Sequence, residues 1–270
     1  MGRLQGKVAI VTGAGGIGNI GLAICEAFLR EGAAVVGTDL RQDQASAVNE
    51  RIGARVGTDR FRYVAHDVTD AKSWRSVLAE TVGAFGGLDV LVNNAGIASH
   101  GGIESTTLED LRRVMAVNHD ALFIGLQVCV PALAQAVARH PGGGAVINNL
   151  SIGSFMANAN NVSYHVSKAA GRMLTLCAAV ELGPKKIRVN SVHPGVTMTP
   201  LMRRGMEAYV EAGVWPSVEA AEEGLKAMSL LDMTSTPEDA AHAFVYLASE
   251  EARFVTGAAI CHDGGLGRRY

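Results

Sequence analysis

Short apolar runs alternate with helical patterns along the whole chain, and this alternation narrows the choice of fold more than any other feature. The apolar runs lie at 8–11, 34–36, 63–65, 90–92, 145–147, 189–192 and 258–260. Between them, apolar residues recur at helical spacing, as in Ile20, Ile24 and Phe28. Apolar strands that are separated by helices are typical of a parallel sheet buried on both faces. The sequence therefore predicts a doubly wound α/β fold of about seven strands, with helices on both faces of the sheet.

We expect the 270 residues to form a single domain, 1–270. Hydrophobic residues make up 48% of the chain and charged residues 19%, which is enough apolar material to fill a large core. No Pro/Ser-rich linker, internal repeat or low-complexity tract divides the chain. Residues 197–235 interrupt the alternation, because they are helical in pattern without an apolar strand. We expect them to form an insertion over the edge of the sheet.

Charge and composition exclude several classes of partner. A formal net charge of -2 provides no basic surface for nucleic acid or an anionic membrane. No stretch reaches the roughly 18 uninterrupted apolar residues of a membrane span. The cysteines and histidines form no ligand-spaced pair, so we expect no metal. These features indicate a cytoplasmic protein that binds a small molecule.

Tyr164 and Lys168 are four residues apart, so a helix would place a phenol and an ammonium on the same face. A tyrosine pKa lies at about 10, and use of the phenol as a base at neutral pH needs a shift that costs about 4 kcal/mol. A positive charge about 4 Å away supplies an energy of that size. Ser151 follows the apolar run 145–150, where a strand end would present its hydroxyl. The combination indicates proton transfer at a carbonyl or alcohol oxygen.

A glycine-rich segment follows the first apolar run directly. Residues 12–21 contain five glycines and lead into a helical pattern. Such a loop lets a pyrophosphate approach backbone N–H groups at a helix N-terminus, which predicts a Rossmann-type dinucleotide site. Asp39 closes the second run, where a carboxylate would bind the adenosine ribose and repel a 2′-phosphate, so we expect NAD. Asp67 and Val68 close the third run and could meet the adenine.

With these motifs placed, the chain resembles the short-chain dehydrogenase/reductase family from about residue 4 to residue 265. Taken singly, each motif is weak evidence, whereas their joint order is specific. In chain order, the matching motifs are the glycine loop at 12–21, Asp67-Val68, Asn93-Asn94-Ala95-Gly96, Asn118, Ser151, Tyr164 with Lys168, the segment 194–199, and Asp263-Gly264-Gly265.

The resemblance implies a catalytic tetrad. Tyr164 would be the acid/base, Ser151 would hold the substrate oxygen, and Lys168 would bind the ribose and lower the tyrosine pKa. Asn118 would support a proton-relay water, and residues 194–199 would bracket the nicotinamide. The implied cofactor contacts are Gly13, Asn19, Ile20, Gly21, Asp39, Asp67, Val68, Asn94, Ala95, Gly96, Tyr164, Lys168, Pro194, Val196 and Thr199, and the substrate contacts are Ser151, Gly153 and Tyr164.

The glycine loop departs from the usual pattern of the family. It is two residues longer, and Asn19 stands where a glycine is expected if Gly21 opens the helix. A longer loop resembles the enoyl-reductase branch of the family. That branch lacks the serine and spaces its Tyr and Lys differently, so Ser151, Tyr164 and Lys168 argue against reduction of a carbon–carbon double bond.

The leading hypothesis is an NAD-dependent oxidoreductase that interconverts a secondary alcohol and a ketone by hydride transfer. An NADPH-dependent ketone reductase is the alternative that Asp39 opposes, and a non-catalytic cofactor sensor is the one that the intact tetrad opposes. Met202, Met206 and Tyr209 fall on one helical face, which suggests that residues 197–235 cover a medium to bulky, apolar substrate, such as a cyclic, aromatic or steroid-like alcohol. The resemblance and the apolar segment 254–270 also imply a homotetramer.

Overall fold

The seven apolar runs form the strands of one parallel sheet in the computed structural model, which describes residues 2–268. The strand order is β3-β2-β1-β4-β5-β6-β7, so the predicted doubly wound Rossmann fold is confirmed. The strands are β1 (Val8–Thr12), β2 (Ala34–Asp39), β3 (Phe61–Ala65), β4 (Val90–Asn93), β5 (Gly144–Asn149), β6 (Ile187–Pro194) and β7 (Ala259–His262). β1, β4 and β6 are buried along their whole length, because helices cover both faces of the sheet.

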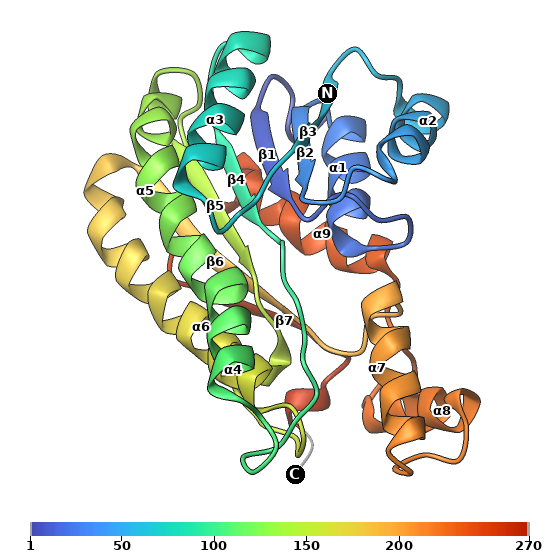
Figure 1. The fold of residues 1–270 in the computed structure, drawn as a ribbon. Helices are drawn as coiled ribbons and strands as arrows, with labels where there is room; N and C mark the ends of the chain where they lie inside the picture. Colours follow the sequence, from blue (N-terminus) through green and yellow to red (C-terminus); the bar gives the residue numbers. More distant parts are fainter. Residues whose placement is uncertain (1, 269–270) are drawn as a thin grey trace.

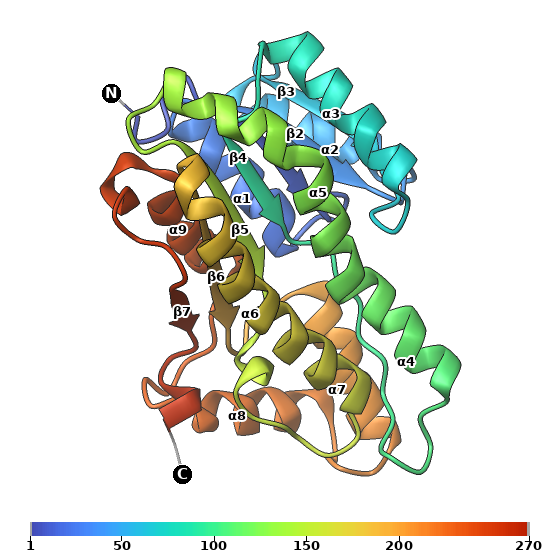
Figure 2. The ribbon, with the colours of Figure 1, turned by 90° about the vertical axis from the view of Figure 1, so that its left-hand side faces the viewer.

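Two helical layers enclose the sheet (Figures 1 and 2). One layer contains α1 (Ile20–Arg30), α2 (Ala45–Val56) and α9 (Pro237–Ala248), and Phe28 and Phe244 lie at the centre of its core. The other contains α3 (Ala71–Phe85), α5 (Ala121–Leu133) and α6 (Val162–Leu182), packed around Trp74 and Leu126. Both cores consist of side chains that leave alternate faces of the same strands.

The sheet reverses its winding direction between β1 and β4, which are neighbours. At such a switch point the loops that follow the two strands lead to opposite faces, which leaves a crevice at the carboxyl edge. The glycine loop follows β1, and residues 94–101 follow β4. Ser151 follows β5, and residues 195–199 follow β6. The fold therefore gathers all the predicted motifs at one edge of the sheet.

The helical stretch Leu108–Ala138 is long and apolar enough to cross a membrane by length and composition, and it is the one such stretch in the part of the chain that the structure describes. It comprises α4 (Leu108–Met115), a π-helical turn (Ala116–Asp120), α5 and a 3-10 segment. Leu122, Leu126, Cys129 and Leu133 face the sheet and are buried. Its apolar composition thus serves a core helix of this fold.

Residues 197–235 form two helices without a strand, as predicted. They are α7 (Pro200–Glu211) and α8 (Val218–Met228), and they lie beyond the carboxyl edge of the sheet (Figure 1). Thr199 caps α7, because its Oγ1 accepts a hydrogen bond from the Met202 N–H at 3.1 Å. An isolated bridge between Thr197 and Ser235 joins the two ends of the segment.

Candidate active site

Ser151 and Tyr164 come together at the carboxyl end of β5. Ser151 follows the strand, Tyr164 lies in the first turn of α6, and the Ser151 hydroxyl is close enough to lower the pKa of the Tyr164 phenol. The Gly153 N–H donates to Ser151 Oγ at 3.0 Å, which fixes the serine rotamer. The structure therefore joins two of the residues that the sequence assigns to the tetrad.

His193 of β6 contacts the backbone of Ser151. Its Nδ1 lies 2.9 Å from the Ser151 carbonyl oxygen, and its Nε2 lies 2.8 Å from Ser191 Oγ. A carbonyl oxygen can only accept, so Nδ1 carries the hydrogen and Nε2 accepts from the serine hydroxyl. Burial lowers the pKa of His193 to about 4, so the ring is neutral. The sequence motifs had not identified this contact, which joins two strands through residues 42 positions apart.

Lys168 is buried one turn after Tyr164. Its Nζ lies 5.6 Å from the centroid of the tyrosine ring and donates a hydrogen bond to the Asn149 carbonyl oxygen at 3.0 Å. Burial lowers the pKa of Lys168 to about 8. Asn149, the last residue of β5, is thus a site residue that the sequence motifs did not identify. It is the second of two asparagines that close this strand.

The pKa of Tyr164 differs from the sequence-based expectation. Burial raises it above its ordinary value, and the hydrogen bond with Ser151 lowers it by less than that rise. The expected net lowering of the tyrosine pKa is therefore wrong for this structure, in which the loss of hydration is the largest effect on the phenol. Tyr164 is a protonated phenol at neutral pH and can donate a proton to an oxygen that is bound beside it.

Asn118 lies in the π-helical turn between α4 and α5, a distortion that is frequent at functional sites. Its Oδ1 accepts from the Ile97 N–H at 2.9 Å, and its Nδ2 donates to the Ile97 carbonyl oxygen at 2.9 Å and to Ser167 Oγ at 3.0 Å. The side chain therefore pins the loop after β4 to α6. A Cβ atom on Gly96 would lie 3.3 Å from Asn118 Oδ1 and 3.5 Å from Lys168 Nζ, so these three predicted residues are neighbours.

The glycine loop ends in a well-capped helix. Asn19 is the N-cap of α1, and its Oδ1 accepts from the Leu22 N–H at 3.1 Å, which explains an asparagine at this position. Gly18 has φ +80°, a conformation that favours glycine. A Cβ atom on Gly21 would collide with the Gly13 carbonyl oxygen. The N–H groups of Ile20 and Gly21 thus open the helix beside a glycine-rich loop.

A hydrogen-bond network holds this loop against β4 and β5. Thr12 Oγ1 accepts from the N–H groups of Asn94 and Ala95 at 2.9 and 3.0 Å. Asn94 Nδ2 donates to the carbonyl oxygens of Thr12 and Gly13, and Asn149 Nδ2 donates to Asn94 Oδ1 at 2.7 Å. The cradle is glycine-rich, held by hydrogen bonds and placed at the switch point, so its residues fit a dinucleotide.

Asp39 closes β2 and anchors the extended loop. Its Oδ2 accepts from the Gly15 N–H at 2.9 Å, and its Oδ1 accepts from the Arg41 N–H at 3.0 Å. The Arg41 Nε lies 3.8 Å from the same carboxylate, and its Nη2 donates to the Gly15 carbonyl oxygen at 3.4 Å. The carboxylate thus has a structural role that the sequence did not indicate. The adjacent guanidinium also softens its repulsion of an anion.

The remaining predicted cofactor residues lie at the same edge. Asp67 and Val68 follow β3, and Asp67 Oδ1 accepts from the Thr69 N–H at 2.9 Å. Val68 is buried, and its carbonyl oxygen accepts from Trp74 Nε1 at 2.9 Å. Pro194 ends β6, and the Val196 carbonyl oxygen accepts from the Ser235 N–H at 2.9 Å. These contacts place the residues without showing a cofactor contact for any of them.

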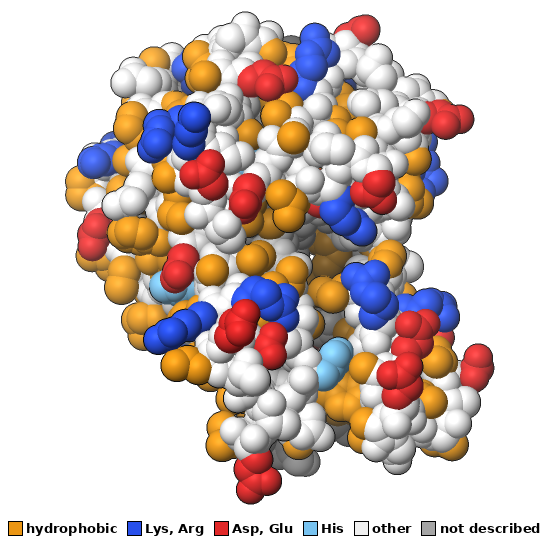
Figure 3. All heavy atoms as spheres, viewed as in Figure 1, with side chains coloured by type: hydrophobic (Ala, Val, Ile, Leu, Met, Phe, Trp, Pro, Cys, Tyr) orange, Lys and Arg blue, Asp and Glu red, His pale blue; other side chains and the backbone are white. Residues whose placement is uncertain are grey.

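The face of α7 with Met202, Met206 and Tyr209 points toward the body of the protein, and Met206 is 2% exposed. Figure 3 shows an indentation with hydrophobic side chains where residues 197–235 meet the body. Tyr209 connects α7 to two loops of the body. Its ring stands edge-on to His100 at 5.6 Å between centroids, and its hydroxyl donates to the Ala159 carbonyl oxygen at 3.4 Å.

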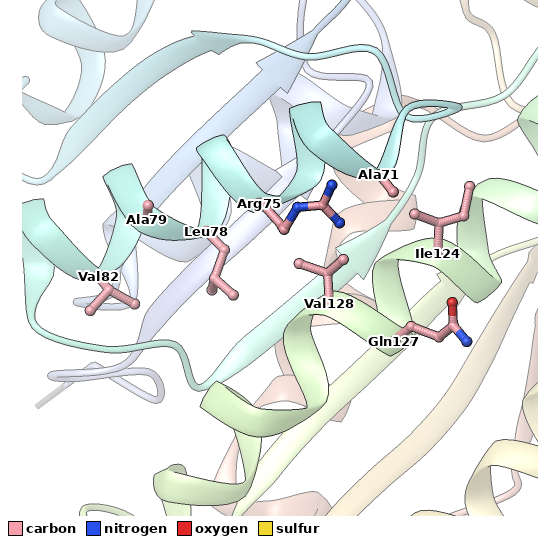
Figure 4. Close-up of a pocket in the computed structure, with 8 residues that line it drawn as sticks. All are labelled: Ala71, Arg75, Leu78, Ala79, Val82, Ile124, Gln127 and Val128. Atoms are coloured by element: carbon pink, nitrogen blue, oxygen red, sulfur yellow. The ribbon is translucent and has the colours of Figure 1, made fainter.

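A separate cavity of about 580 Å³ lies between the outer faces of α3 and α5 (Figure 4). Apolar side chains line most of it, with Arg75 and Gln127 at its rim, and none of the tetrad residues borders it. The groove contains no pair of groups for proton transfer, so it is not the active site.

The chain matches a known protein family over nearly its whole length. Residues 13–267 match the family profile that is described as Enoyl-(Acyl carrier protein) reductase. The chain belongs to the short-chain dehydrogenase/reductase family, as the motifs indicated.

Three relatives match nearly the whole chain. A 2,5-dichloro-2,5-cyclohexadiene-1,4-diol dehydrogenase from Sphingobium indicum is 37% identical over 97% of both chains. An NADP-dependent (R)-specific alcohol dehydrogenase from Lentilactobacillus kefiri is 39% identical over 97% of both chains. A 3-alpha-(or 20-beta)-hydroxysteroid dehydrogenase from Mycobacterium bovis is 36% identical over 98% of this chain and 90% of the relative.

Proposed function

We propose that this protein is an NAD-dependent oxidoreductase that interconverts a secondary alcohol and a ketone. The observation that carries the proposal is the closeness of the Ser151 and Tyr164 side chains, with Lys168 buried beside them and the glycine cradle at the same sheet edge. Two hydroxyls that converge beside a dinucleotide cradle can hold and protonate one substrate oxygen.

The chain's own groups divide the proton chemistry among them. Bound nicotinamide supplies or accepts the hydride. Tyr164 is protonated at neutral pH, so in the reductive direction it donates its proton to the carbonyl oxygen and becomes a phenolate. In oxidation the phenol first loses its proton to solvent, and the phenolate then takes the hydroxyl proton of the alcohol. Ser151 orients the same oxygen, because its rotamer is held by Gly153. Lys168 holds α6 against the end of β5, and Asn118 holds the loop after β4. Both elements thus keep their positions around the reacting oxygen.

The cofactor proposal rests on Asp39. A carboxylate at the end of β2 favours the ribose hydroxyls of NAD over the 2′-phosphate of NADP. One relative is named as NADP-dependent, and Arg41 lies beside the carboxylate, so the preference has to be measured. The three relatives together support a nicotinamide cofactor, and the carboxylate supports NAD as the member of that class.

For the substrate, we propose a medium to bulky apolar alcohol, cyclic, aromatic or steroid-like. Two relatives are named for a cyclohexadiene diol and a hydroxysteroid, and the inner face of α7 is apolar and adaptable. Residues 197–235 serve as the lid. Gly153 lies next to Ser151 and forms part of the substrate contact in this proposal.

A panel assay tests the function. Secondary alcohols of increasing apolar size are incubated with NAD or NADP, and the absorbance of the reduced cofactor is followed. We expect kcat/KM to rise with apolar size in wild type and to lose that dependence in Met202→Ala/Met206→Ala. Small polyols as the best substrates would contradict the substrate class. If the protein binds the cofactor but turns over no alcohol or ketone, the result would favour the non-catalytic sensor. If it prefers to reduce an enoyl thioester, the result would favour the activity for which the family profile is named.

We further propose a homotetramer in the cytoplasm. An apolar stripe stays exposed on α6, with Val166 48%, Met173 57% and Val180 79% exposed. The edge strand β7 also carries exposed apolar residues, and Phe254 before it is fully exposed. Of the segment 254–270, residues 269–270 lie outside the described residues. Two separate apolar surfaces support an assembly that is larger than a dimer.

A further inference from the structure

The segment between Ser151 and Tyr164 forms one wall of the proposed substrate site. It begins with a single 3-10 turn (Ile152–Ser154) and then runs without regular structure to α6 at Val162. A wall without a hydrogen-bond ladder needs other contacts to keep its shape. His165, the residue directly after the catalytic tyrosine, provides two such contacts across residues 153–158.

His165 makes two hydrogen bonds to this wall. Its Nδ1 lies 3.0 Å from the Gly153 carbonyl oxygen, and its Nε2 lies 3.1 Å from the Asn158 N–H nitrogen. A carbonyl oxygen only accepts and a backbone N–H only donates, so Nδ1 carries the hydrogen and Nε2 offers the lone pair. The two contacts together select one neutral tautomer of the ring.

The contact with Gly153 is close enough to constrain the sequence. A Cβ atom at Gly153 would lie 2.7 Å from His165 Nδ1 and 3.3 Å from Ser151 Oγ. The His165 ring also stands edge-on to the Tyr164 ring, with 6.0 Å between centroids. The imidazole thus sits between the catalytic phenol and the backbone that carries the serine.

The rest of the wall is held from other elements. Tyr209 of α7 donates to the Ala159 carbonyl oxygen, and the Gly101 N–H donates to the Asn160 carbonyl oxygen at 3.0 Å. Before Asn158, the Phe155 ring packs against His193, with 4.7 Å between centroids, and against the Arg172 guanidinium at 4.4 Å. The stretch between Gly153 and Asn158, which lies nearest to Ser151, is bridged by the His165 ring.

We propose that His165 is a positioning residue for the substrate. Its neutral Nδ1–H tautomer holds the wall at Gly153 and Asn158. The wall in turn places the oxygen of the bound alcohol or ketone beside Ser151 and Tyr164. The inference rests on the proposed function, since it concerns the substrate side of the same site. His165 does not reach the cofactor cradle, so its effect falls on substrate affinity and leaves cofactor affinity unchanged.

The test compares His165→Leu with His165→Gln. Leucine removes both hydrogen bonds, whereas glutamine again offers one donor and one acceptor. We expect His165→Leu to raise the KM for the best secondary alcohol by about tenfold, the size expected for one lost hydrogen bond, and to change kcat and the cofactor KM by less than about threefold. His165→Gln should restore the KM to within about threefold of wild type. His242→Leu, an exposed histidine on α9, serves as the control.

A second readout is independent of turnover. Amide hydrogen exchange of residues 153–161 without substrate should be at least about tenfold faster in His165→Leu than in wild type, and should return to the wild-type rate in His165→Gln. An active wild type whose substrate KM and exchange rates match those of His165→Leu would overturn the inference alone. A wild type without any alcohol or ketone turnover would overturn the proposed function, and the exchange rates would still decide whether His165 holds the wall.

Discussion

At the scale of single residues, burial decides the chemistry of the site as much as charge does. The lost hydration of Tyr164 raises its pKa, and the same burial lowers the pKa of Lys168 to about 8. The two pKa values therefore move apart, so that Lys168 loses its proton before Tyr164 does as the pH rises. His193 stays neutral behind Ser151 for the same reason.

Tyr164→Phe should abolish turnover and leave cofactor binding intact. The change deletes one hydroxyl, which in our proposal transfers the proton, so kcat should fall by at least about 100-fold. The affinity for NADH, measured by fluorescence titration, should stay within about threefold of wild type, because the ring still fills its place on α6. Near-normal kcat in this variant would assign proton transfer to another residue.

Asp39→Ala should lower kcat/KM with NAD more than kcat/KM with NADP. The variant loses a ribose acceptor and also the anchor for the Gly15 N–H, so kcat/KM with NAD should drop by about tenfold or more. With NADP the lost repulsion offsets part of this drop. Wild-type and variant kcat/KM values for both cofactors check the prediction, and Arg41→Ala reports how much of any NADP use depends on the guanidinium. Preference of the wild type for NADP would refute the assignment.

At the scale of elements, the unusual glycine loop is stabilised from outside the loop. Asp39 of β2 holds Gly15, Asn94 after β4 holds Gly13, and Asn19 caps α1. The two additional residues thus keep the helix N-terminus open instead of covering it. α6 has a comparable double role, since Tyr164 and Lys168 serve the site and His165 braces the wall that precedes the helix.

Gly21→Ala should cost cofactor affinity, because its Cβ atom would meet the Gly13 carbonyl oxygen and displace the cradle. We expect the Kd for NADH to rise by at least about tenfold, the lower range for inserting a methyl group into a packed site. Gly83→Ala on α3 is the matched control, since a Cβ atom there meets nothing within 4 Å. Equal Kd values for both variants would show that the loop does not hold the cofactor at this point.

At the scale of the whole molecule, two buried histidines tie stability to pH. His66, which contacts Thr38 and Trp74, and His193 are almost fully buried, and burial lowers the pKa of each to about 4 from 6.5. The unfolded chain binds protons on these residues before the folded chain does as the pH falls. Their contribution is therefore complete above pH 6.5 and is lost as the pH falls toward 4.

When the pH falls from 7 to 5, each of these two histidines should lower the free energy of unfolding by about 2 kcal/mol. Urea unfolding of wild type and His66→Asn at both pH values measures this, and the difference between the two pH values should shrink by about that amount in the variant. His242→Asn, at an exposed site, should leave the difference unchanged. A pH dependence that is identical in all three proteins would contradict the low pKa of His66.

The exposed stripe on α6 and the apolar strand β7 predict a tetramer in solution. Multi-angle light scattering at micromolar concentration should give about four times the 28.2 kDa of one chain. Val180→Asp, at the most exposed position of the stripe, should lower that mass while the circular dichroism spectrum stays unchanged. A mass near one chain in wild type would rule out the proposal.

The order of strands and helices, the glycine loop and the pair of Tyr164 and Lys168 could be recognised in the primary structure, because each depends on local periodicity or on spacing within one turn. The complete tetrad with Asn118 and Ser151 was implied by the resemblance to the family. The bonds of His193 to Ser151, of Lys168 to Asn149 and of Gly15 to Asp39 could not, since they join residues that only the folded sheet brings together. The direction of the Tyr164 pKa shift could not be recognised from the sequence either. A spacing of four residues indicates a neighbouring charge, whereas hydration depends on every element that closes over the site.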